Sequence, residues 1–141
     1  MSVRVKIEGI PKITKNMDKW EEKILKVAHG AVIKSAKIDV ETGAKKKITQ
    51  DKHIDTGRLR ASIHTSYNGN DIHSYSDNEG KSFQGKLDVR YKEYNVFVGT
   101  DVEYAEKIEM LDSYIFYAYK MGKNKLPKRI QKDVKKLLNR G

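Results

Sequence analysis

The feature that most constrains how this chain can fold is a helical repeat of apolar and small side chains between residues 16 and 48. Its members recur at steps of three and four residues, which aligns them along one side of an α-helix. They are Met17, Trp20, Ile24, Ala28, Ala31, Ser35, Ile38 and Thr42. A helix of this length measures on the order of 45 Å at about 1.5 Å per residue, more than a small domain usually needs. The repeat therefore predicts one long helix against which the rest of the chain packs.

Small residues occupy the middle of this repeat, at Ala28, Ala31 and Ser35, and they allow another backbone to approach closely. They fit a core helix within one subunit, and they also fit a helix that contacts a neighbouring subunit. A glycine inside a helix costs about 1 kcal/mol relative to alanine. We therefore expect a bend or a break near Gly30 or Gly43.

Four further segments have the composition of β-strands, and most of them show the two-residue alternation of apolar and polar side chains. They are residues 2–10, 59–65, 87–91 and 96–100. A helical pattern returns at 104–119 and again from Pro127 to about Asn139. This order predicts an α+β fold in a single domain over residues 1–141: a small antiparallel β-sheet packed against a long N-terminal helix, with further C-terminal helices.

Residues 67–86 are rich in Asn, Ser, Gly, Asp and Tyr and poor in aliphatic side chains. Asn68-Gly69 is a favoured turn pair in hairpins, so the segment is either a polar loop or a protruding β-hairpin. Tyrosine mixed with small polar residues is typical of adaptable contact surfaces and also of plain surface loops. The candidate interface residues here are Tyr67, Asn68 and Tyr75.

The net charge of +10 is concentrated near the C-terminal end. Residues 120–141 hold nine Lys or Arg and one acid, which leaves 20 basic and 18 acidic side chains in the first 119 residues. Residues 124–139 are therefore predicted to form a basic helix. Such a helix contacts phosphates or an acidic protein face, or it simply presents a solvated face. The candidate contacts are Lys128, Arg129, Lys132 and Lys136.

Composition also limits the classes of function. Cysteine is absent, which excludes disulfides and thiolate metal sites and is typical of a protein made in a reducing cytoplasm. No run of about 18 apolar residues is present, so we expect no membrane partner. The first residues lack the apolar core of a secretory signal.

Candidate catalytic and metal-binding residues fail on spacing or on their neighbours. The four histidines lack the spacing of zinc sites: His29, His53, His64 and His73. Asp55-Thr56-Gly57 matches the aspartic protease triplet, but a polar run precedes it and Arg58 follows it. A cation there keeps the carboxylate ionised and opposes the shared proton that those enzymes need.

No glycine-rich phosphate loop and no Gly-x-Ser-x-Gly elbow occur. Glu103, Glu106 and Glu109 are spaced three apart without a catalytic partner, so we interpret them as a solvated or interfacial face. We expect no enzymatic activity, no cofactor and no metal.

Two segments carry the most specific signal. The first is His53-Ile54-Asp55-Thr56-Gly57-Arg58-Leu59-Arg60-Ala61-Ser62-Ile63, and the second runs from Val96 to Glu109. Together they resemble the head–tail joining, or tail-completion, family of long-tailed double-stranded DNA bacteriophages and prophages. The residues that match its motifs are Asp55, Thr56, Gly57, Leu59, Arg60, Ser62, Ile63, Val98, Gly99, Thr100, Tyr104, Ala105 and Glu109. Where that family usually has a glycine-containing turn after the glutamate, this chain has Met110-Leu111-Asp112-Ser113.

The resemblance implies a structural protein of the virion neck, made in the bacterial host cytoplasm, that joins the head to the tail. Its implied partners are copies of itself in a ring such as a hexamer, a connector or head-completion protein, and the tail tube or tail terminator protein. Double-stranded DNA would pass through the ring without sequence-specific contacts. Within this scheme Arg58 and Arg60 are expected to meet acids such as Glu103 or Glu109, and residues 67–86 to face the channel or the next ring. Without the resemblance, the residues are also compatible with a second function, that of a small basic nucleic-acid-binding protein.

Overall fold

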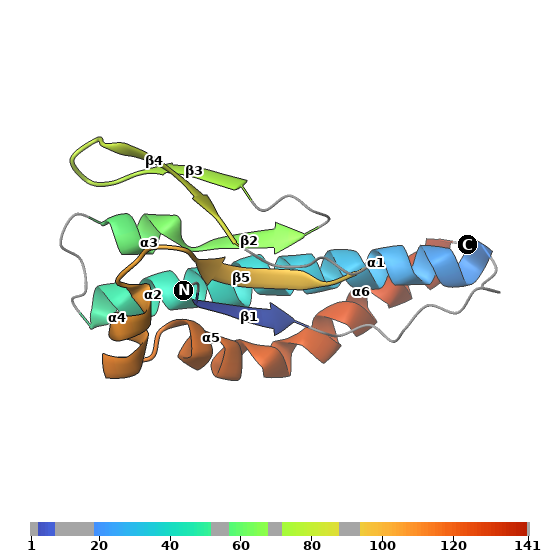
Figure 1. Ribbon diagram of the computed structural model, residues 1–141. Helices are drawn as coiled ribbons and strands as arrows, with labels where there is room; N and C mark the ends of the chain where they lie inside the picture. The colour runs from blue at the N-terminus through green and yellow to red at the C-terminus, as the bar shows by residue number, and fades with distance from the viewer. Residues whose placement is uncertain (1–2, 8–18, 52–56, 68–71, 88–93, 141) are drawn as a thin grey trace.

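The computed structural model describes residues 3–7, 19–51, 57–67, 72–87 and 94–140 (Figure 1). The strands are β1 (Val3–Ile7), β2 (His64–Tyr67), β3 (Ile72–Ser76), β4 (Ser82–Lys86) and β5 (Val96–Thr100). The helices are α1 (Lys19–Ser35), the π-helix η1 (Ala36–Glu41), α2 (Thr42–Gln50), α3 (Arg58–Ser62), α4 (Ala105–Leu111), α5 (Ile115–Gly122), the 3-10 helix η2 (Lys123–Lys125) and α6 (Leu126–Arg140). The predicted α+β fold is confirmed: a small antiparallel sheet lies against a long helix, and further helices follow at the C-terminal end.

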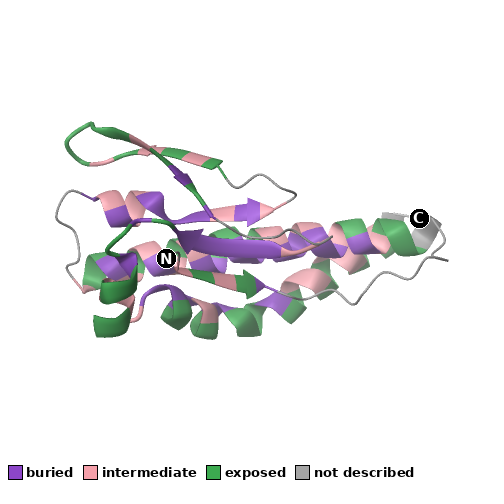
Figure 2. Ribbon diagram, in the orientation of Figure 1, coloured by how far each residue is buried: buried purple, intermediate pink, exposed green. Residues whose placement is uncertain are grey.

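The main sheet has three antiparallel strands in the order β1-β5-β2. Val98 at the centre of β5 pairs with Val5 on one side and with Thr65 on the other. Every residue of β5 is buried, as Figure 2 shows for this central strand, because neighbours cover both of its faces. The prediction of a strand at 96–100 is confirmed, and this strand anchors the core.

The long helix is continuous from Lys19 to Gln50, but η1 interrupts its α-helical geometry. A π turn holds an extra residue, which rotates everything after it by about 100° relative to an α-helix. Ala28, Ala31 and Ser35 are buried as predicted. From η1 onward the prediction is wrong, because Ile38 within η1 and Thr42 directly after it are exposed. The buried positions there are Ala36, Asp39, Val40, Ala44 and Ile48.

Neither glycine breaks the long helix. Gly30 lies inside α1, where an added Cβ would meet nothing within 4 Å. At Gly43 an added Cβ would lie 3.2 Å from the Cβ of Ala118 in α5. Gly43 therefore allows α2 and α5 to pack closely. The irregular part of the long helix is η1, which ends before Gly43.

The predicted strand at 59–65 is wrong over most of its length, because Arg58–Ser62 form α3 and the strand begins at His64. The chain enters α3 through Gly57, whose φ of 81° is in the left-handed region that favours glycine. Alternation over so few residues is also compatible with one helical turn, and Leu59 and Ser62, three apart, are both buried. Ile63 is fully buried, as a core residue should be.

Residues 67–86 include a second, two-stranded antiparallel sheet formed by β3 and β4, so part of this segment is a hairpin. Its turn is held by Asp77, whose Oδ1 accepts the backbone N–H groups of Glu79 and Lys81, each at 2.9 Å. Asn68-Gly69 and most of the predicted 87–91 strand lie outside the described residues, and Leu87 is buried directly after β4.

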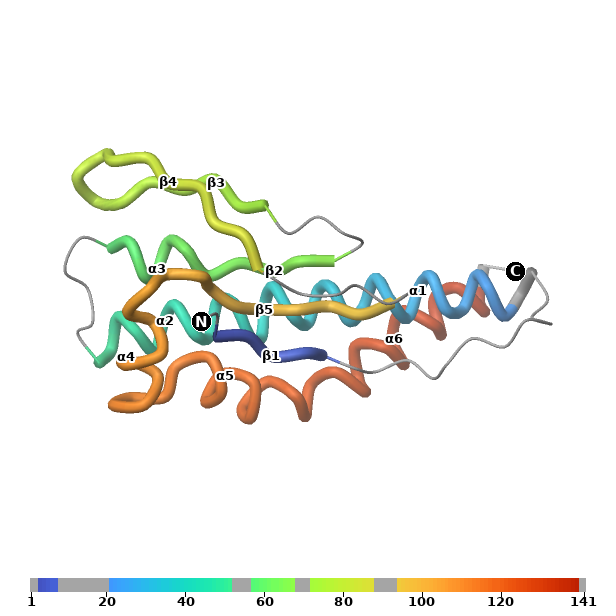
Figure 3. Tube along the Cα trace, viewed as in Figure 1, coloured from blue at the N-terminus to red at the C-terminus, as the bar shows by residue number. Residues whose placement is uncertain are grey.

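The C-terminal third forms helices as predicted, although the helical run expected at 104–119 is divided into α4 and α5. α5 packs against α2, η1 and β1, and α6 packs along α1. Pro127 lies in the first turn of α6, where its missing N–H costs nothing. In the Cα trace, α4 lies near one end of the molecule and α6 extends to the other end (Figure 3).

Candidate functional site

The two segments that carry the resemblance are adjacent in the fold. His64, directly after the first segment, pairs with Gly99 of the second in the β2–β5 ladder. The buried hydroxyls of Ser62 and Thr100 lie 2.6 Å apart. Ser62 Oγ donates to the Leu59 carbonyl at 2.7 Å, so Thr100 donates to Ser62. Thr100 Oγ1 in turn accepts the N–H of Val102 at 3.1 Å. This chain of hydrogen bonds joins α3 to β5.

Gly99 matters because β1 passes very close to it. A Cβ added at Gly99 would clash with the carbonyl oxygen of Val3 and lie 3.0 Å from the Cα of Arg4. Backbone atoms cannot move aside as the tip of a side chain can. The Val98-Gly99-Thr100 run therefore serves strand packing on both sides of β5.

The remaining matched residues have structural contacts or fall outside the described part. Asp55 and Thr56 lie outside it. Ala105, at the first position of α4, is fully buried, and its carbonyl accepts a 3.0 Å hydrogen bond from the hydroxyl of Tyr114. Tyr104 precedes that helix and is partly exposed.

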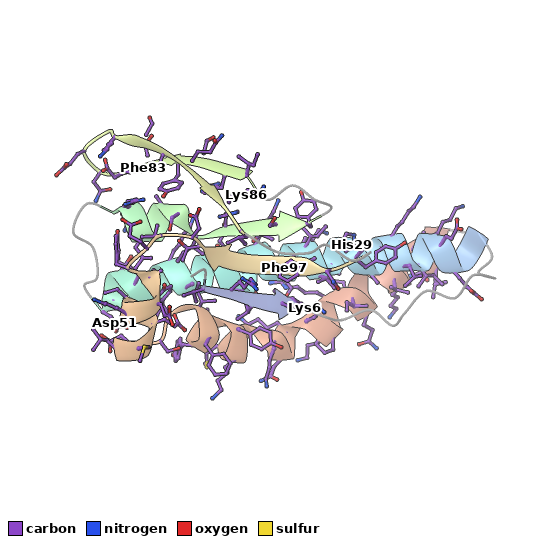
Figure 4. The ribbon with its side chains drawn as sticks, viewed as in Figure 1. Lys6, His29, Asp51, Phe83, Lys86 and Phe97 are labelled. Atoms are coloured by element: carbon purple, nitrogen blue, oxygen red, sulfur yellow. The ribbon has the colours of Figure 1, made fainter. Side chains whose placement is uncertain are left out.

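Of the two arginines expected to meet acids, Arg58 does so within the subunit. Its Nη1 lies 3.0 Å from Glu103 Oε1, and its guanidinium carbon lies 4.3 Å from the centre of the Phe83 ring. Figure 4 shows Phe83 on the hairpin, above α3. Arg60 instead donates to Thr49 Oγ1 at 3.3 Å.

Glu109 caps the N-terminus of α5. From the sequence, we interpreted this glutamate as part of a solvated or interfacial face, and the cap was not predicted. Its two carboxylate oxygens accept the backbone N–H groups of Tyr114, Ile115 and Phe116 at 3.0–3.1 Å. The Ser113 hydroxyl also donates to it at 3.0 Å. These N–H groups have no partner within the helix, so an acceptor from outside is needed. The sequence signal was Glu109 followed by a serine one turn later, just before an apolar helix.

Replacing Glu109 with alanine is expected to lower the free energy of unfolding by about 0.5–2 kcal/mol, the range for loss of a helix cap. Amide exchange should accelerate at Tyr114, Ile115 and Phe116 because they lose their acceptor. Denaturant titration and hydrogen exchange measure the two effects. Glu106→Ala, an exposed acid one turn earlier, is the control. Equal effects for both variants would contradict the capping role.

The basic helix α6 has two different sides. Its lysines Lys128, Lys132, Lys135 and Lys136 are exposed, and helical spacing places them within one arc of about 100°. Arg129 borders this arc, about 20° beyond Lys136, and makes two 2.8 Å hydrogen bonds to Asp39 in η1. Arg129, a candidate contact, is therefore engaged inside the subunit.

Asp39, the acid of this contact, is almost fully buried, with a side chain 1% exposed. Burial alone would raise the pKa of Asp39, but hydrogen bonds from Arg129 and from Ser35 (2.8 Å) outweigh it and hold the pKa below the ordinary value of 3.8. The carboxylate is therefore ionised at neutral pH and fixes α6 to the long helix.

Stacked rings fix the hairpin to the main sheet. His64 of β2 stacks on His73 of β3 at 4.7 Å between ring centres, His73 stacks on Tyr75 at 5.4 Å, and Tyr75 on Phe83 at 5.5 Å. His73 Nε2 lies 2.9 Å from the Ala61 carbonyl and so carries a proton. Tyr75 is thus part of this stack, while Tyr67 of β2 lies under the ammonium of Lys37 at 5.4 Å. Asn68 lies outside the described residues.

The stack should loosen in acid. Burial is the main cause that lowers the pKa of His73 from its ordinary value of 6.5. The hydrogen bond to the Ala61 carbonyl and the charge of Glu41 oppose this shift, while the positive charges of His64 and Lys45 add to it. Because the unfolded chain takes up this proton at higher pH than the folded one, the contribution of His73 is complete above 6.5 and falls as the pH drops toward the folded pKa.

We therefore expect the contacts of the hairpin to weaken progressively as the pH falls below 6.5. Amide and ring signals of β3 and β4 in NMR spectra report this weakening. His73→Gln retains a donor for Ala61 without a titrating group, so its hairpin signals should depend much less on pH. The same pH profile in His73→Gln and wild type would contradict the role of His73.

Within the described residues, no three His, Asp or Glu side chains are arranged to hold a metal ion. His53 lies outside them, and the buried His29 packs edge-on against Tyr94 at 5.1 Å between ring centres. No helix in the described part is long and apolar enough to cross a membrane.

Two apolar surfaces are found among the residues that the structure describes. Five of the nine large apolar side chains that are exposed in the described part lie on α4 and α5, which we call the α4–α5 face: Met110, Leu111, Phe116, Tyr117 and Met121. The second surface is a groove of about 880 Å³ between α6, η1 and the end of β1, which we call the α6 groove. Its apolar lining includes Ile7, Val40, Tyr119, Ile130, Val134 and Leu138.

No family model, curated protein or solved structure matches this chain. The likeness to phage head–tail joining proteins thus depends on the matched residues of the two segments. Those residues are concentrated at the α3–β5 junction and at the start of α4. Their contacts are those of a scaffold.

Proposed function

We propose that this protein is a structural component of the neck of a tailed bacteriophage, where copies of it form a ring that joins the head to the tail and lets DNA pass. It acts through protein surfaces and needs no catalysis, cofactor or metal. Its partners are neighbouring copies, a connector or head-completion protein on one side and a tail tube or terminator protein on the other.

The observation that carries this proposal is the contact between the two motif segments. A chance likeness in short, separate stretches gives no reason for the matched residues to meet. Here Ser62 and Thr100, one from each segment and 38 positions apart, share a buried hydrogen bond of 2.6 Å. Gly57 and Gly99 occupy positions where a side chain is strained or excluded. The matched letters thus correspond to physical requirements of one local structure.

The uncovered surfaces support the same proposal. Monomeric proteins rarely leave large contiguous apolar patches exposed, and such patches usually mark contacts with other proteins. This chain exposes five large apolar side chains on α4 and α5, and the α6 groove adds a second apolar surface. In a larger assembly, both surfaces would be buried against other subunits.

Head–tail joining in vitro tests the proposal. Lysates of a phage or prophage that carries this gene, with the gene deleted, should contain filled heads and free tails, and adding the purified protein should restore joined particles seen by electron microscopy. Joined particles in the deletion lysate without added protein would refute the role. A matched addition of Ser62→Val, which removes the buried hydroxyl, should restore fewer particles because the scaffold is weakened.

A second candidate is a small basic nucleic-acid-binding protein, which the lysine side of α6 favours. Four lysines of α6 lie on one arc with no acid among them, and the one acid of α6, Asp133, pairs with Lys34 at 3.3 Å outside that arc. If phosphates bind there, the logarithm of affinity falls linearly with the logarithm of salt concentration, and each removed contact reduces that slope by about 1. Fluorescence anisotropy with duplex DNA for wild type and Lys132→Ala measures it. DNA affinity that is weak and unchanged by Lys132→Ala would exclude this candidate.

A further inference from the structure

The α6 groove is bordered by positive charge. Its apolar lining is continued by Leu138, which is 55% exposed, and its rim carries Lys123 and Lys135. Residues 120–141 as a whole hold nine basic side chains and one acid. The groove therefore fits an apolar projection that carries acidic side chains.

The end of α4 is such a projection. Met110 and Leu111 are 81% and 74% exposed, the largest fractions among the apolar side chains described. Residues 101–113 hold five acids and one lysine. Glu106 lies one turn before Met110 and so on the same side of α4, and Asp112 follows Leu111 directly.

The groove and the end of α4 lie apart along the molecule. α4 is near one end, whereas α6 runs from the middle to the other end (Figure 3). A projection at one end and a matching groove toward the other allow one copy to join the next in the same direction. Contacts of this kind, between two different surfaces, generate closed rings or open filaments.

We propose that the end of α4 in one copy, with Met110 and Leu111, inserts into the α6 groove of a second copy of this chain. The inference deepens the proposed ring and rests on it for the ring's closure. Burial of the two apolar side chains supplies most of the favourable free energy. Opposite charges on the two surfaces set the direction and oppose the alternative pairing of two α4 ends, which would bring Glu106 and Asp112 of both copies together.

Disulfide trapping tests the contact, and the absence of native cysteine makes it clean. Leu111→Cys and Leu138→Cys change exposed side chains, so both variants should fold. The two full-length variants, one carrying an affinity tag, are mixed and oxidised with copper–phenanthroline. We expect the mixed disulfide dimer to exceed either homodimer about tenfold, a preference of about 1.4 kcal/mol.

Two controls make the result decisive. Ile72→Cys on β3, also exposed, replaces Leu111→Cys in a parallel mixture and should give only the background of random collision. Glu106→Lys added to Leu111→Cys should reduce the mixed dimer, and Lys135→Glu added to Leu138→Cys should restore it. Predominance of Leu111→Cys homodimers, or equal trapping by Ile72→Cys, would overturn the proposal.

Failure of this contact and failure of the proposed function give different results. If the mixed dimer forms but the protein does not restore head–tail joining, the contact between copies is supported and the role in the neck is refuted. If the protein restores head–tail joining, and Glu106→Lys changes neither joining nor the yield of the mixed disulfide dimer, the role in the neck is supported and this contact is refuted.

Discussion

Replacing Arg129 with alanine should lower the free energy of unfolding by about 3–5 kcal/mol, the range for removing one partner of a buried ion pair. The loss is large because the Asp39 side chain is 1% exposed and is left as a buried charge, whereas Arg129 is 31% exposed. Asp39→Ala should cost less, because the arginine that remains can reach water. The double variant should cost less than the sum of the two single variants. Denaturant unfolding of the four proteins measures all three expectations.

The pH dependence of this pair has a sign that can be checked. In wild type the pKa of Asp39 is lowered, so its contribution to stability is present above 3.8 and lost as the pH falls through the lower, folded value. In Arg129→Ala, burial acts with less opposition and should raise the pKa of Asp39 above 3.8, so acid should then favour the folded state. The difference in stability between wild type and variant should therefore shrink in acid. A difference that stays constant with pH would show that the charge of Asp39 is not the cause.

Gly99→Ala should destabilise the protein by about 1–3 kcal/mol, the cost of overpacking a tight contact. The added methyl group meets the backbone of Val3 and Arg4, so β1 must shift away from β5. Hydrogen exchange should accelerate in β1 before it does in α1. Gly30→Ala is the matched control: the same change in an open position of α1 should stabilise by about 0.5–1 kcal/mol. The same sign for both variants would contradict the proposed close approach at Gly99.

Patterns of apolar and polar residues along the sequence correctly predicted those helices and strands in which burial depends on residues nearby in the sequence. The central strand at 96–100 and the first half of the long helix follow from such patterns, because a side chain's burial there repeats with the local period. Part of the candidate site also followed: the residues chosen for their likeness to a family, such as Ser62 and Thr100, are buried at one junction. The pairing of Arg58 with Glu103 was among the expectations as well, and it is confirmed.

Errors arose where a distant partner decides the conformation. The segment at 59–62 alternates like a strand, but a left-handed Gly57 and the burial of Leu59 and Ser62 against β5 make it a helix. Glu109 was interpreted as surface, because its acceptor role depends on α4 ending at Leu111 and α5 starting nearby.

Periodicity and composition within single segments were enough to predict the fold class, the central strand, the basic last helix and the long N-terminal helix. The side of that helix that is buried after Ser35 depends instead on contacts with distant parts of the chain. The π-helix turns Asp39 inward, where Arg129, 90 positions away, neutralises it. A helical repeat contains no information about such a partner, because the cost of burying a charge is met only once α6 is in place.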